Sequence, residues 1–342
     1  MADVRVGILG ATGLVGEHLL TILAERRFPV GELRLWGSER SRGRAIRYRG
    51  TAVTVGLATD AEVAAVDILF GAAGNGPSER FVPVARAAGA LVVDKASLFR
   101  MRPDVPLVVP EVNPEALPRD PRGALVASPN CSTIPLVMVL KALSSLGTIE
   151  RVTVSTYQAV SGSGRDALEE LEAQEAALGA ADDPPPRVYP APIARNVLAH
   201  CDAFGPDGMT KEETKLVEES RKILGRPDLR VSATAVRVPV RVGHSEAVGI
   251  EFDRPVEVAA ARALLGAFDG LRVLEDPPAG AVPTPRDAEG RDEVLVGRLR
   301  PDAAVPDGRG LLLWLCADNL RKGAALNAVQ IAERLVLAGV RR

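Results

Sequence analysis

The chain opens with a short apolar run that ends in glycine and passes straight into a helical pattern. The run covers residues 4–9, and apolar residues recur at helical spacing over residues 14–24. Glycines at such a turn let backbone N–H groups approach a pyrophosphate, which the start of the helix then stabilises. A tight turn without a ligand is the alternative. The pattern favours a dinucleotide site, and the residues expected to form it are Gly10, Thr12, Gly13, Leu14 and Val15.

More strands separated by helix-length segments follow. Apolar strands are predicted over residues 33–36, 66–70 and 90–94. Strands of this kind are typical of a parallel sheet that is covered on both faces. The sequence therefore predicts an α/β fold whose N-terminal part is a Rossmann-type doubly wound domain.

The pattern changes after residue 130. β-Branched and polar residues alternate over residues 149–157, 230–241 and 247–252, which predicts half-solvated, antiparallel strands. Helices are expected over residues 165–178, 210–224 and 318–337, and a proline-rich loop over 182–192. We expect a second, α+β domain over residues 131–317. Residues 1–130 and 318–342 should form the first domain.

Composition narrows the class of protein. The 342 residues carry a net charge of −2 with no basic tract, so nucleic acid is not an expected partner. Neither a signal peptide nor a membrane-spanning run is visible, so we expect a cytoplasmic protein with no membrane association. Three cysteines and three histidines are scattered along the chain, which predicts no disulfide framework and no metal site.

The end of the second predicted strand bears on the choice of cofactor. Ser38, Arg40 and Ser41 lie in a loop bounded by glycines, and hydroxyls with a nearby arginine suit the 2′-phosphate of NADP. Glu39 leaves NAD open because an acidic residue there can bind the ribose hydroxyl. A plain surface loop is a third reading. The loop favours NADP.

Cys131 lies where an apolar strand gives way to a helix. A thiol at a helix start has a lowered pKa because of the free N–H groups and the helix dipole, which predicts a nucleophile. Cys201 and Cys316 have no such setting and are read as inert buried residues. A thiol nucleophile needs an acid or base, and His244 is a candidate beside Arg237, provided that the chain turns at Gly243. Spacing alone leaves a surface histidine equally open.

Six motifs occur together in one order. They are Gly10-Ala11-Thr12-Gly13, Ser38-Glu39-Arg40-Ser41, Pro129-Asn130-Cys131-Ser132-Thr133, Ser155-Thr156-Tyr157-Gln158-Ala159-Val160-Ser161-Gly162, Gly243-His244-Ser245-Glu246-Ala247 and Asp318-Asn319-Leu320-Arg321-Lys322-Gly323-Ala324-Ala325. Over essentially the whole chain they resemble the aspartate-β-semialdehyde dehydrogenase family.

The resemblance implies a reaction and a set of roles. The reaction is the reversible, NADP-dependent conversion of β-aspartyl phosphate to aspartate β-semialdehyde and phosphate, on the route to lysine, threonine and methionine. By resemblance, Cys131 is the nucleophile, His244 the general acid/base and Gln158 the residue that orients the intermediate. The other implied contacts are Arg237, Glu212 and Asn130 for the substrate, Arg100 and Lys215 for phosphate, and Ser161, Gly162 and Asn319 for NADP. It also implies a homodimer formed through a catalytic and dimerisation domain.

The chain departs from the family pattern at a few positions. Lys95 and Ala96 replace an Asn-Ser pair, Gly71 stands where a serine is usual, and Asn75 begins a turn that is usually rich in serine. Two alternatives stay open. One is N-acetyl-γ-glutamyl-phosphate reductase, whose substrate has no free amino group; the other is a catalytically silent paralogue that acts as a binding subunit.

Overall fold

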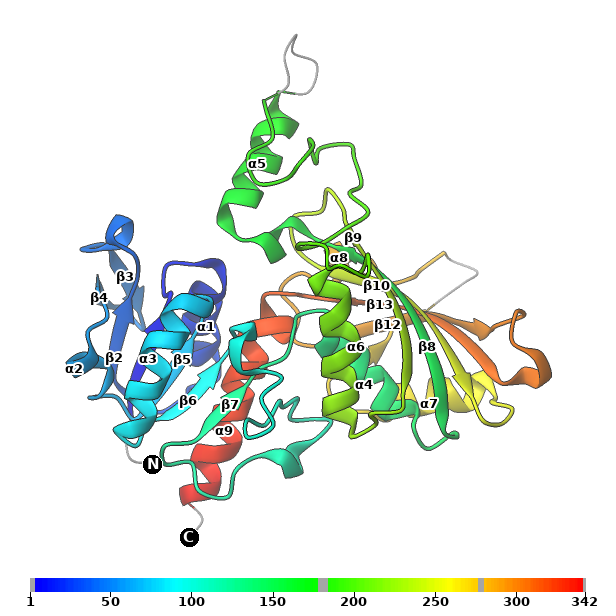
Figure 1. The fold of residues 1–342 in the computed structure, drawn as a ribbon, viewed down its shortest axis with the longest axis horizontal. Coiled ribbons are helices and arrows are strands. Elements are labelled where there is room, and N and C mark those ends of the chain that lie inside the picture. Colours follow the sequence, from blue (N-terminus) through cyan, green and yellow to red (C-terminus); the bar gives the residue numbers. More distant parts are fainter. Residues whose placement is uncertain (1–3, 178–183, 276–279, 341–342) are drawn as a thin grey trace. The chain divides into compact units, whose positions relative to one another are not determined.

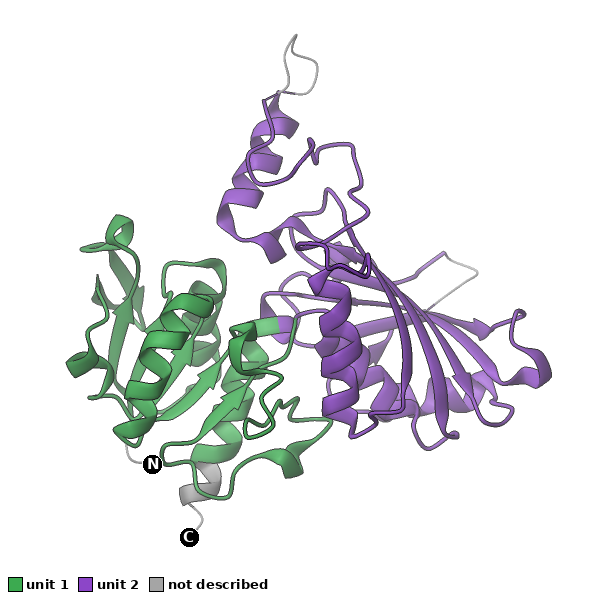
Figure 2. Cartoon of the chain, viewed as in Figure 1, with its two compact units in different colours: residues 1–130, 324–342 green, residues 131–323 purple. Residues whose placement is uncertain are grey.

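The computed structural model describes residues 4–177, 184–275 and 280–340. The chain forms two compact units, shown in different colours in Figure 2. Unit 1 consists of residues 1–130 and 324–342, and unit 2 consists of residues 131–323. Each unit is built on its own sheet, and the chain leaves unit 1 and later returns to it.

The sheet of unit 1 has seven strands, and Figure 1 labels all of them except β1. In sheet order they are β3 (Ala45–Tyr48), β4 (Thr51–Gly56), β2 (Val30–Trp36), β1 (Val4–Leu9), β5 (Ile68–Gly71), β6 (Leu91–Asp94) and β7 (Leu125–Ala127). Every neighbouring pair runs parallel except β3 and β4. The order reverses between β1 and β5, so this is the doubly wound sheet expected from the sequence.

Four helices cover the sheet of unit 1. Helices α1 (Leu14–Glu25) and α9 (Leu326–Val340) pack together over one face, whereas α2 (Asp60–Val63) and α3 (Asn75–Ala87) pack together on the other. Val6 and Ile8 of β1 alternate inward and are fully buried with Ile22 of α1 and Val329 of α9. Removing such a side chain from a core costs about 2–5 kcal/mol. The last helix thus completes the core of unit 1.

The sheet of unit 2 has six strands. In sheet order they are β11 (Leu271–Val273), β12 (Val294–Pro301), β13 (Gly310–Ala317), β10 (His244–Phe252), β8 (Ile149–Gln158) and β9 (Arg230–Arg237). The expectation of antiparallel strands is wrong for β8 and β9, which run parallel. β11 and β12, to which that expectation did not extend, are also parallel. Long crossovers explain this, because parallel neighbours need a connection much longer than a hairpin. Residues 159–229, with two helices, join β8 to β9.

Helices cover one face of this sheet. They are α4 (Thr133–Leu143), α6 (Lys211–Leu224) and α7 (Val258–Ala267). Thr210 begins α6 with a capping box, in which its side chain accepts from the Glu213 N–H and Glu213 accepts from the Thr210 N–H. Helix α5 (Arg165–Ala176) lies apart from the sheet. Its buried Glu170 and Gln174 side chains accept hydrogen bonds from backbone N–H groups of the proline-rich segment, at residues 187–194. Residues 178, 182 and 183 lie outside the described residues.

Two expected boundaries are wrong. The strand predicted over 230–241 ends at Arg237, because Pro239 has no N–H for the ladder and the chain then turns at Gly243, whose φ is +98°. The last helix begins eight residues later than expected. The Asp318 side chain accepts from the N–H groups of Leu320 and Arg321, which holds a turn ahead of a short π-helix.

Short helical turns complete the fold. They are α8 (Pro285–Ala288), η1 (Glu39–Ser41), η2 (Ser97–Phe99), η3 (Pro114–Ala116), η4 (Val160–Ser163), η6 (Pro306–Gly308) and the π-helix η7 (Arg321–Ala325). Within the described ranges, no helix is long and apolar enough to cross a membrane.

Candidate active site

The ends of three strands bring polar side chains into one row in unit 2. Gln158 is the last residue of β8 and pairs with Arg237, the last residue of β9. His244 is the first residue of β10, whose next residue pairs with Tyr157 of β8. Directly paired residues share a face of a sheet, so Gln158, Arg237 and His244 point to the same side. We call these three residues the catalytic row.

The row lies beside Cys131. The sulfur of Cys131 is 3.3 Å from Nε2 of His244, whose side chain is 1% exposed. The backbone N–H of Ala159 donates to Nδ1 of the same ring at 3.0 Å. Because Nδ1 accepts this bond, the proton of the neutral ring is on Nε2 and faces the sulfur.

Cys131 directly precedes Ser132, the N-cap of α4. Its side chain is partly exposed, in contrast to the buried Cys201 and Cys316. The position at a helix start favours a thiolate. Burial has the opposite effect on the other two thiols, raising the pKa of Cys201 to about 12 and that of Cys316 to about 11.

Gln158 is fixed by two hydrogen bonds. Its Nε2 donates to Oγ of Ser132 at 2.8 Å and to Oε1 of Glu212 at 3.2 Å. The amide is therefore oriented by the start of α4 and by α6 together, close to the nucleophile.

Arg237 and His244 converge on Gly162. A Cβ at Gly162 would lie 3.0 Å from Nη1 of Arg237 and 3.2 Å from Nε2 of His244, so glycine permits this close approach. Nη1 of the buried Arg237 also donates to the carbonyl of Ala159 at 2.7 Å. Arg241 does not join the row, since it is exposed and forms an ion pair with Glu172.

Glu212 and Lys215 lie one turn apart on α6. Nζ of Lys215 binds Oε2 of the buried Glu212 at 3.0 Å and Oδ2 of Asp202 at 2.9 Å. Burial lowers the pKa of Lys215, but the two carboxylates outweigh it and the net shift is upward. The structure thus brings six predicted site residues together in unit 2: Cys131, Gln158, Glu212, Lys215, Arg237 and His244.

The glycine turn of unit 1 is sterically constrained. Gly10 has a φ of +82°, and a Cβ there would lie 2.7 Å from the carbonyl of Ala72. A Cβ at Gly16 would lie 2.2 Å from the carbonyl of Gly10. Gly13 is the N-cap of α1 and supplies no side-chain cap, so Leu14 and Val15 begin a helix whose N–H groups suit an anion.

The loop after β2 approaches this turn. Oγ1 of Thr12 lies 3.0 Å from Oγ of Ser41. Glu39 forms an exposed ion pair with Arg42 at 3.9 Å, and Arg40, which is also exposed, makes no ion pair among the described residues. Ser38, the N-cap of η1, is also exposed.

The remaining predicted residues divide between the units. Nδ2 of Asn319 donates to Oγ of Ser161 at 2.9 Å, and its Oδ1 accepts from the N–H of Gly243 at 2.9 Å. Asn319 and Ser161 therefore lie in unit 2, close to His244 of the catalytic row. Arg100 and Asn130 are buried in unit 1, where Nη2 of Arg100 donates to the carbonyl of Lys95 at 2.6 Å.

The departure at Gly71 has a local cause. A Cβ there would lie 2.0 Å from Oδ1 of Asp94, whose carboxylate occupies the space that a side chain needs. Oδ1 also accepts from Oγ of Ser78 at 2.8 Å. Burial raises the pKa of Asp94 to about 6. Ala96 is buried and Lys95 is partly exposed.

Sequence reasoning gives no role to two groups at this site. One is the backbone of Ala159, which residue identity does not reveal. The other is Glu246, whose side chain is 0% exposed. Strand alternation was the available signal, because Glu246 is two residues from His244 and therefore on its face. No cluster of metal-binding type is present in the part of the chain that the structure describes.

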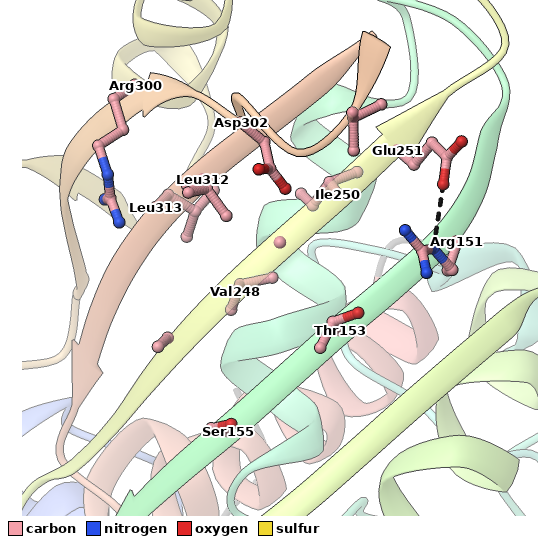
Figure 3. Close-up of a pocket in the computed structure, with 13 residues that line it drawn as sticks. Arg151, Thr153, Ser155, Val248, Ile250, Glu251, Arg300, Asp302, Leu312 and Leu313 are labelled. Atoms are coloured by element: carbon pink, nitrogen blue, oxygen red, sulfur yellow. Dashed lines mark hydrogen bonds and ion pairs between the residues drawn. The ribbon is translucent and has the colours of Figure 1, made fainter.

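A shallow pocket of about 290 Å³ lies on the opposite face of the unit 2 sheet (Figure 3). Thr153 and Ser155 of β8 line it, and Arg151 forms an ion pair with Glu251 at 3.0 Å on its rim. Thr153 and Ser155 alternate with the inward residues of β8, so this pocket is separate from the catalytic row.

Two family models match the chain. One describes the NAD-binding domain of semialdehyde dehydrogenase and matches residues 5–119. The other describes the semialdehyde dehydrogenase dimerisation domain and matches residues 140–322. The fold and the thiol site thus define a semialdehyde dehydrogenase, an oxidoreductase with a nicotinamide-dinucleotide domain.

Relatives narrow the family further. Aspartate-semialdehyde dehydrogenase of Aquifex aeolicus is 46% identical over 338 residues, covering 98% of this chain and 99% of that protein. A structure of aspartate semialdehyde dehydrogenase II from Vibrio cholerae, complexed with ASA, has a TM-score of 0.94 and 43% identity over 98% and 99% of the two chains. A structure from Candida albicans with NADP has a TM-score of 0.75 and 25% identity over 99% and 100% of the chains. The chain belongs to the aspartate-semialdehyde dehydrogenase family.

Proposed function

We propose that this protein catalyses the NADP-dependent, reversible reductive dephosphorylation of β-aspartyl phosphate to aspartate β-semialdehyde. The observation that carries the proposal is the contact of the Cys131 sulfur with Nε2 of His244 at the start of α4. Relatives named for this activity span almost the whole chain, which supports the same assignment.

Cys131 is the proposed nucleophile. Its thiolate attacks the acyl carbon of β-aspartyl phosphate, a C–S bond forms, and the C–O bond to phosphate breaks. The products of this half-reaction are a thioester on Cys131 and inorganic phosphate. NADPH, when bound, supplies the hydride that reduces the thioester to the aldehyde. As the C–S bond breaks, its electron pair returns to sulfur.

His244 acts on the same sulfur. The N–H of Ala159 keeps the ring proton on Nε2, so His244 donates a hydrogen bond to the thiolate. This bond stabilises the thiolate both as the free nucleophile and as the leaving group of the aldehyde-forming step. Gln158 orients the intermediate, since Ser132 and Glu212 already fix its amide.

Charged side chains explain recognition of an amino acid. The guanidinium of Arg237 suits the substrate carboxylate, and the carboxylate of Glu212 suits its ammonium group. The same charge of Glu212 argues against an N-acetylated substrate, which has no ammonium group. Lys215 and Arg100 are the proposed phosphate ligands, with Asn130 beside the nucleophile in sequence.

The glycine turn is the proposed dinucleotide site. A helix start without a side-chain cap fits a pyrophosphate, and the hydroxyls of Thr12 and Ser41 fit a phosphate beside it. Arg40 is exposed in the same loop as Ser38 and Ser41 and makes no ion pair among the described residues, which supports NADP. The residues proposed to contact NADP from unit 2 are Ser161, Gly162 and Asn319.

We also propose a homodimer formed through the open face of the unit 2 sheet. The rings of Tyr157 and Trp314 pack there with their centroids 5.2 Å apart and a tilt of 44°, and Tyr157 is 38% exposed. Large aromatic side chains on an uncovered sheet face are typical of a surface that a partner covers. The matching family model is itself described as a dimerisation domain.

The test is an assay that follows NADPH formation from aspartate β-semialdehyde and NADP⁺, with and without phosphate. We expect formation that depends on phosphate. In the same assay, Cys131→Ser should lose several powers of ten in turnover, as other covalent catalysts do, and still bind NADPH. Cys201→Ser is the matched control and should stay active. A Cys131→Ser enzyme with more than about a tenth of wild-type activity would rule out the covalent route.

A further inference from the structure

A second row of side chains lies one step behind the catalytic row in the same sheet. Glu246 is two residues beyond His244 on β10, and Thr156 is two residues before Gln158 on β8. Glu246 and Thr156 are directly paired across the two strands, and Leu315 of β13 pairs with Glu246 on its other side. Strand alternation places all of them on the face of the catalytic row.

This second row contains an unusual acid. Glu246 is 0% exposed, and neither of its carboxyl oxygens has a hydrogen-bond partner among the described residues. Oγ1 of Thr156, opposite it, also has no partner in that set. A buried carboxylate without a partner is among the most costly groups in a protein, so this arrangement disfavours the ionised form.

Several charged or titratable groups face or adjoin this layer. His244 and Arg237 belong to the adjoining catalytic row, where His244 contacts Cys131 and Gln158 donates to Glu212. Glu213 accepts from the N–H of Ala235, which pairs with Thr156. Cys316 pairs with Ser245 and lies on the other face of the sheet. Burial and then the charge of Glu212 raise the pKa of Glu246 well above its ordinary value. Glu212 adjoins this layer through Gln158, which donates to it and lies one step along β8 from the Thr156–Glu246 pair.

The two carboxyl groups differ in their partners. Glu212 receives hydrogen bonds from Gln158 at 3.2 Å and from Lys215 at 3.0 Å, which stabilise its negative charge. Glu246 has no such donor. Two neighbouring carboxyl groups in a low-dielectric layer do not both ionise readily, and the one without donors keeps its proton.

We propose that Glu246 is a positioning residue, an uncharged carboxyl in the second row that allows Glu212 alone to carry the negative charge for the substrate's amino group. This inference rests on the proposed function of Glu212. If Glu246 ionises, the two charges repel, and the Gln158–Glu212 hydrogen bond is the contact that weakens. The Michaelis constant for aspartate β-semialdehyde then rises, while that for phosphate and the turnover number keep their own pH dependence.

The protonation state is tested first, without substrate. Infrared difference spectra of wild type against Glu246→Gln should show the carbonyl stretch of a protonated carboxyl at neutral pH. In Glu212→Gln, which lacks the neighbouring charge, this band should disappear at a lower pH than in wild type. A wild-type spectrum without the band overturns the proposal, even if the enzyme is fully active. A protein that has the band but no dehydrogenase activity instead refutes the proposed function.

Kinetics test the positioning role. As pH rises, we expect the wild-type Michaelis constant for aspartate β-semialdehyde to increase by about tenfold, the scale of one hydrogen bond to a charged group, and that of Glu246→Gln to stay flat. Thr156→Val is the matched control, because it changes the same layer without a titratable group, and it should retain the wild-type profile. The proposal is overturned if Glu246→Gln follows the wild-type profile, or if Thr156→Val flattens it as well.

Discussion

At the scale of single residues, the backbone of Ala159 organises the proposed active site. Its N–H donates to His244 at 3.0 Å, and its carbonyl accepts from Arg237 at 2.7 Å. One residue therefore sets both the tautomer of the acid/base and the orientation of the guanidinium. The side chain of residue 159 makes neither contact, which explains why composition and motif spacing do not reveal this role.

Arg40 offers a test of cofactor preference. Its side chain is exposed and makes no ion pair among the described residues, so it is available to a 2′-phosphate. We expect Arg40→Ala to weaken NADP binding by about 1.5–3 kcal/mol, the scale of a charge-assisted hydrogen bond, and to leave NAD binding nearly unchanged. Titration of both cofactors by protein fluorescence measures this. Equal losses would instead point to Glu39 as a ribose ligand.

Variants of Glu212 and Lys215 test the identity of the substrate. Glu212→Gln keeps the shape and removes the charge, so the Michaelis constant for aspartate β-semialdehyde should rise more than that for phosphate. Lys215→Ala should affect phosphate more. Because Lys215 binds Glu212 at 3.0 Å, we also expect the double variant to be non-additive. Steady-state kinetics that are unchanged in both single variants would mean that this helix face is merely charged surface.

At the scale of elements, the βα turn of unit 1 depends on two glycines for different reasons. Gly16 allows α1 to touch the turn itself, whereas Gly13 begins α1 and leaves its N–H groups without a side-chain cap. Gly16 is therefore required for packing, whereas Gly13 is required for binding of the proposed dinucleotide.

Alanine variants separate these two requirements. A Cβ at residue 16 would lie 2.2 Å from the Gly10 carbonyl, so Gly16→Ala should lower the thermal midpoint by several degrees even without cofactor. At residue 13 the nearest atom would be 3.4 Å away, an ordinary contact, so Gly13→Ala should fold normally. Its expected defect is weaker NADP binding. Equal thermal midpoints for the two variants would contradict this division.

Sequence patterns predicted most elements because each carries a local signal. The run Val4–Leu9 and the helix expected over residues 210–224 carry the periodicity of the elements they form, and the structure confirms both. The predicted antiparallel direction of β9 relative to β8 was wrong, because residue alternation does not reveal which strands become neighbours. The contact of Cys131 with His244 joins residues 113 positions apart, so spacing left it open and the family motifs favoured it. The assigned roles at the site, and the domain limits at residues 130 and 318, stay predictions.

At the scale of the whole molecule, the chain passes between the units twice. The passages lie at residues 130–131 and 323–324. A Cβ at Gly323 would lie 3.1 Å from Cβ of Cys131, so both passages meet beside the proposed nucleophile. The dinucleotide turn and the thiol are thus carried by different units, each with its own core.

Buried Asp94 predicts a pH dependence of overall stability. Its pKa is about 6 in the folded protein against an ordinary value of 3.8. A raised folded pKa means that the stability it contributes is complete below the ordinary value and is lost as pH rises through about 6. The loss is up to about 3 kcal/mol. Asp94→Asn stays neutral, so its stability relative to wild type should increase over this range.

Thermal unfolding of the full chain across this pH range measures the effect. Asp67→Asn is the control, because hydrogen bonds from Arg5 lower the pKa of Asp67 and its contribution is lost only below the ordinary value. The loss of stability of Asp67→Asn relative to wild type should therefore stay constant above pH 4, which is about the ordinary pKa of an aspartate. If the difference in stability between Asp94→Asn and wild type is also constant over this pH range, the folded protein keeps Asp94 ionised there and the prediction is wrong.

The return of the chain to unit 1 has a consequence for its synthesis. Val329 and Ile331 of α9 are fully buried in the core around β1, yet the ribosome makes them only after the whole of unit 2. At about 5–20 residues per second, translation of the intervening unit takes some tens of seconds. During that interval the apolar face that α9 will cover is exposed on the nascent chain. The core of unit 1 therefore stays incomplete until unit 2 has been translated.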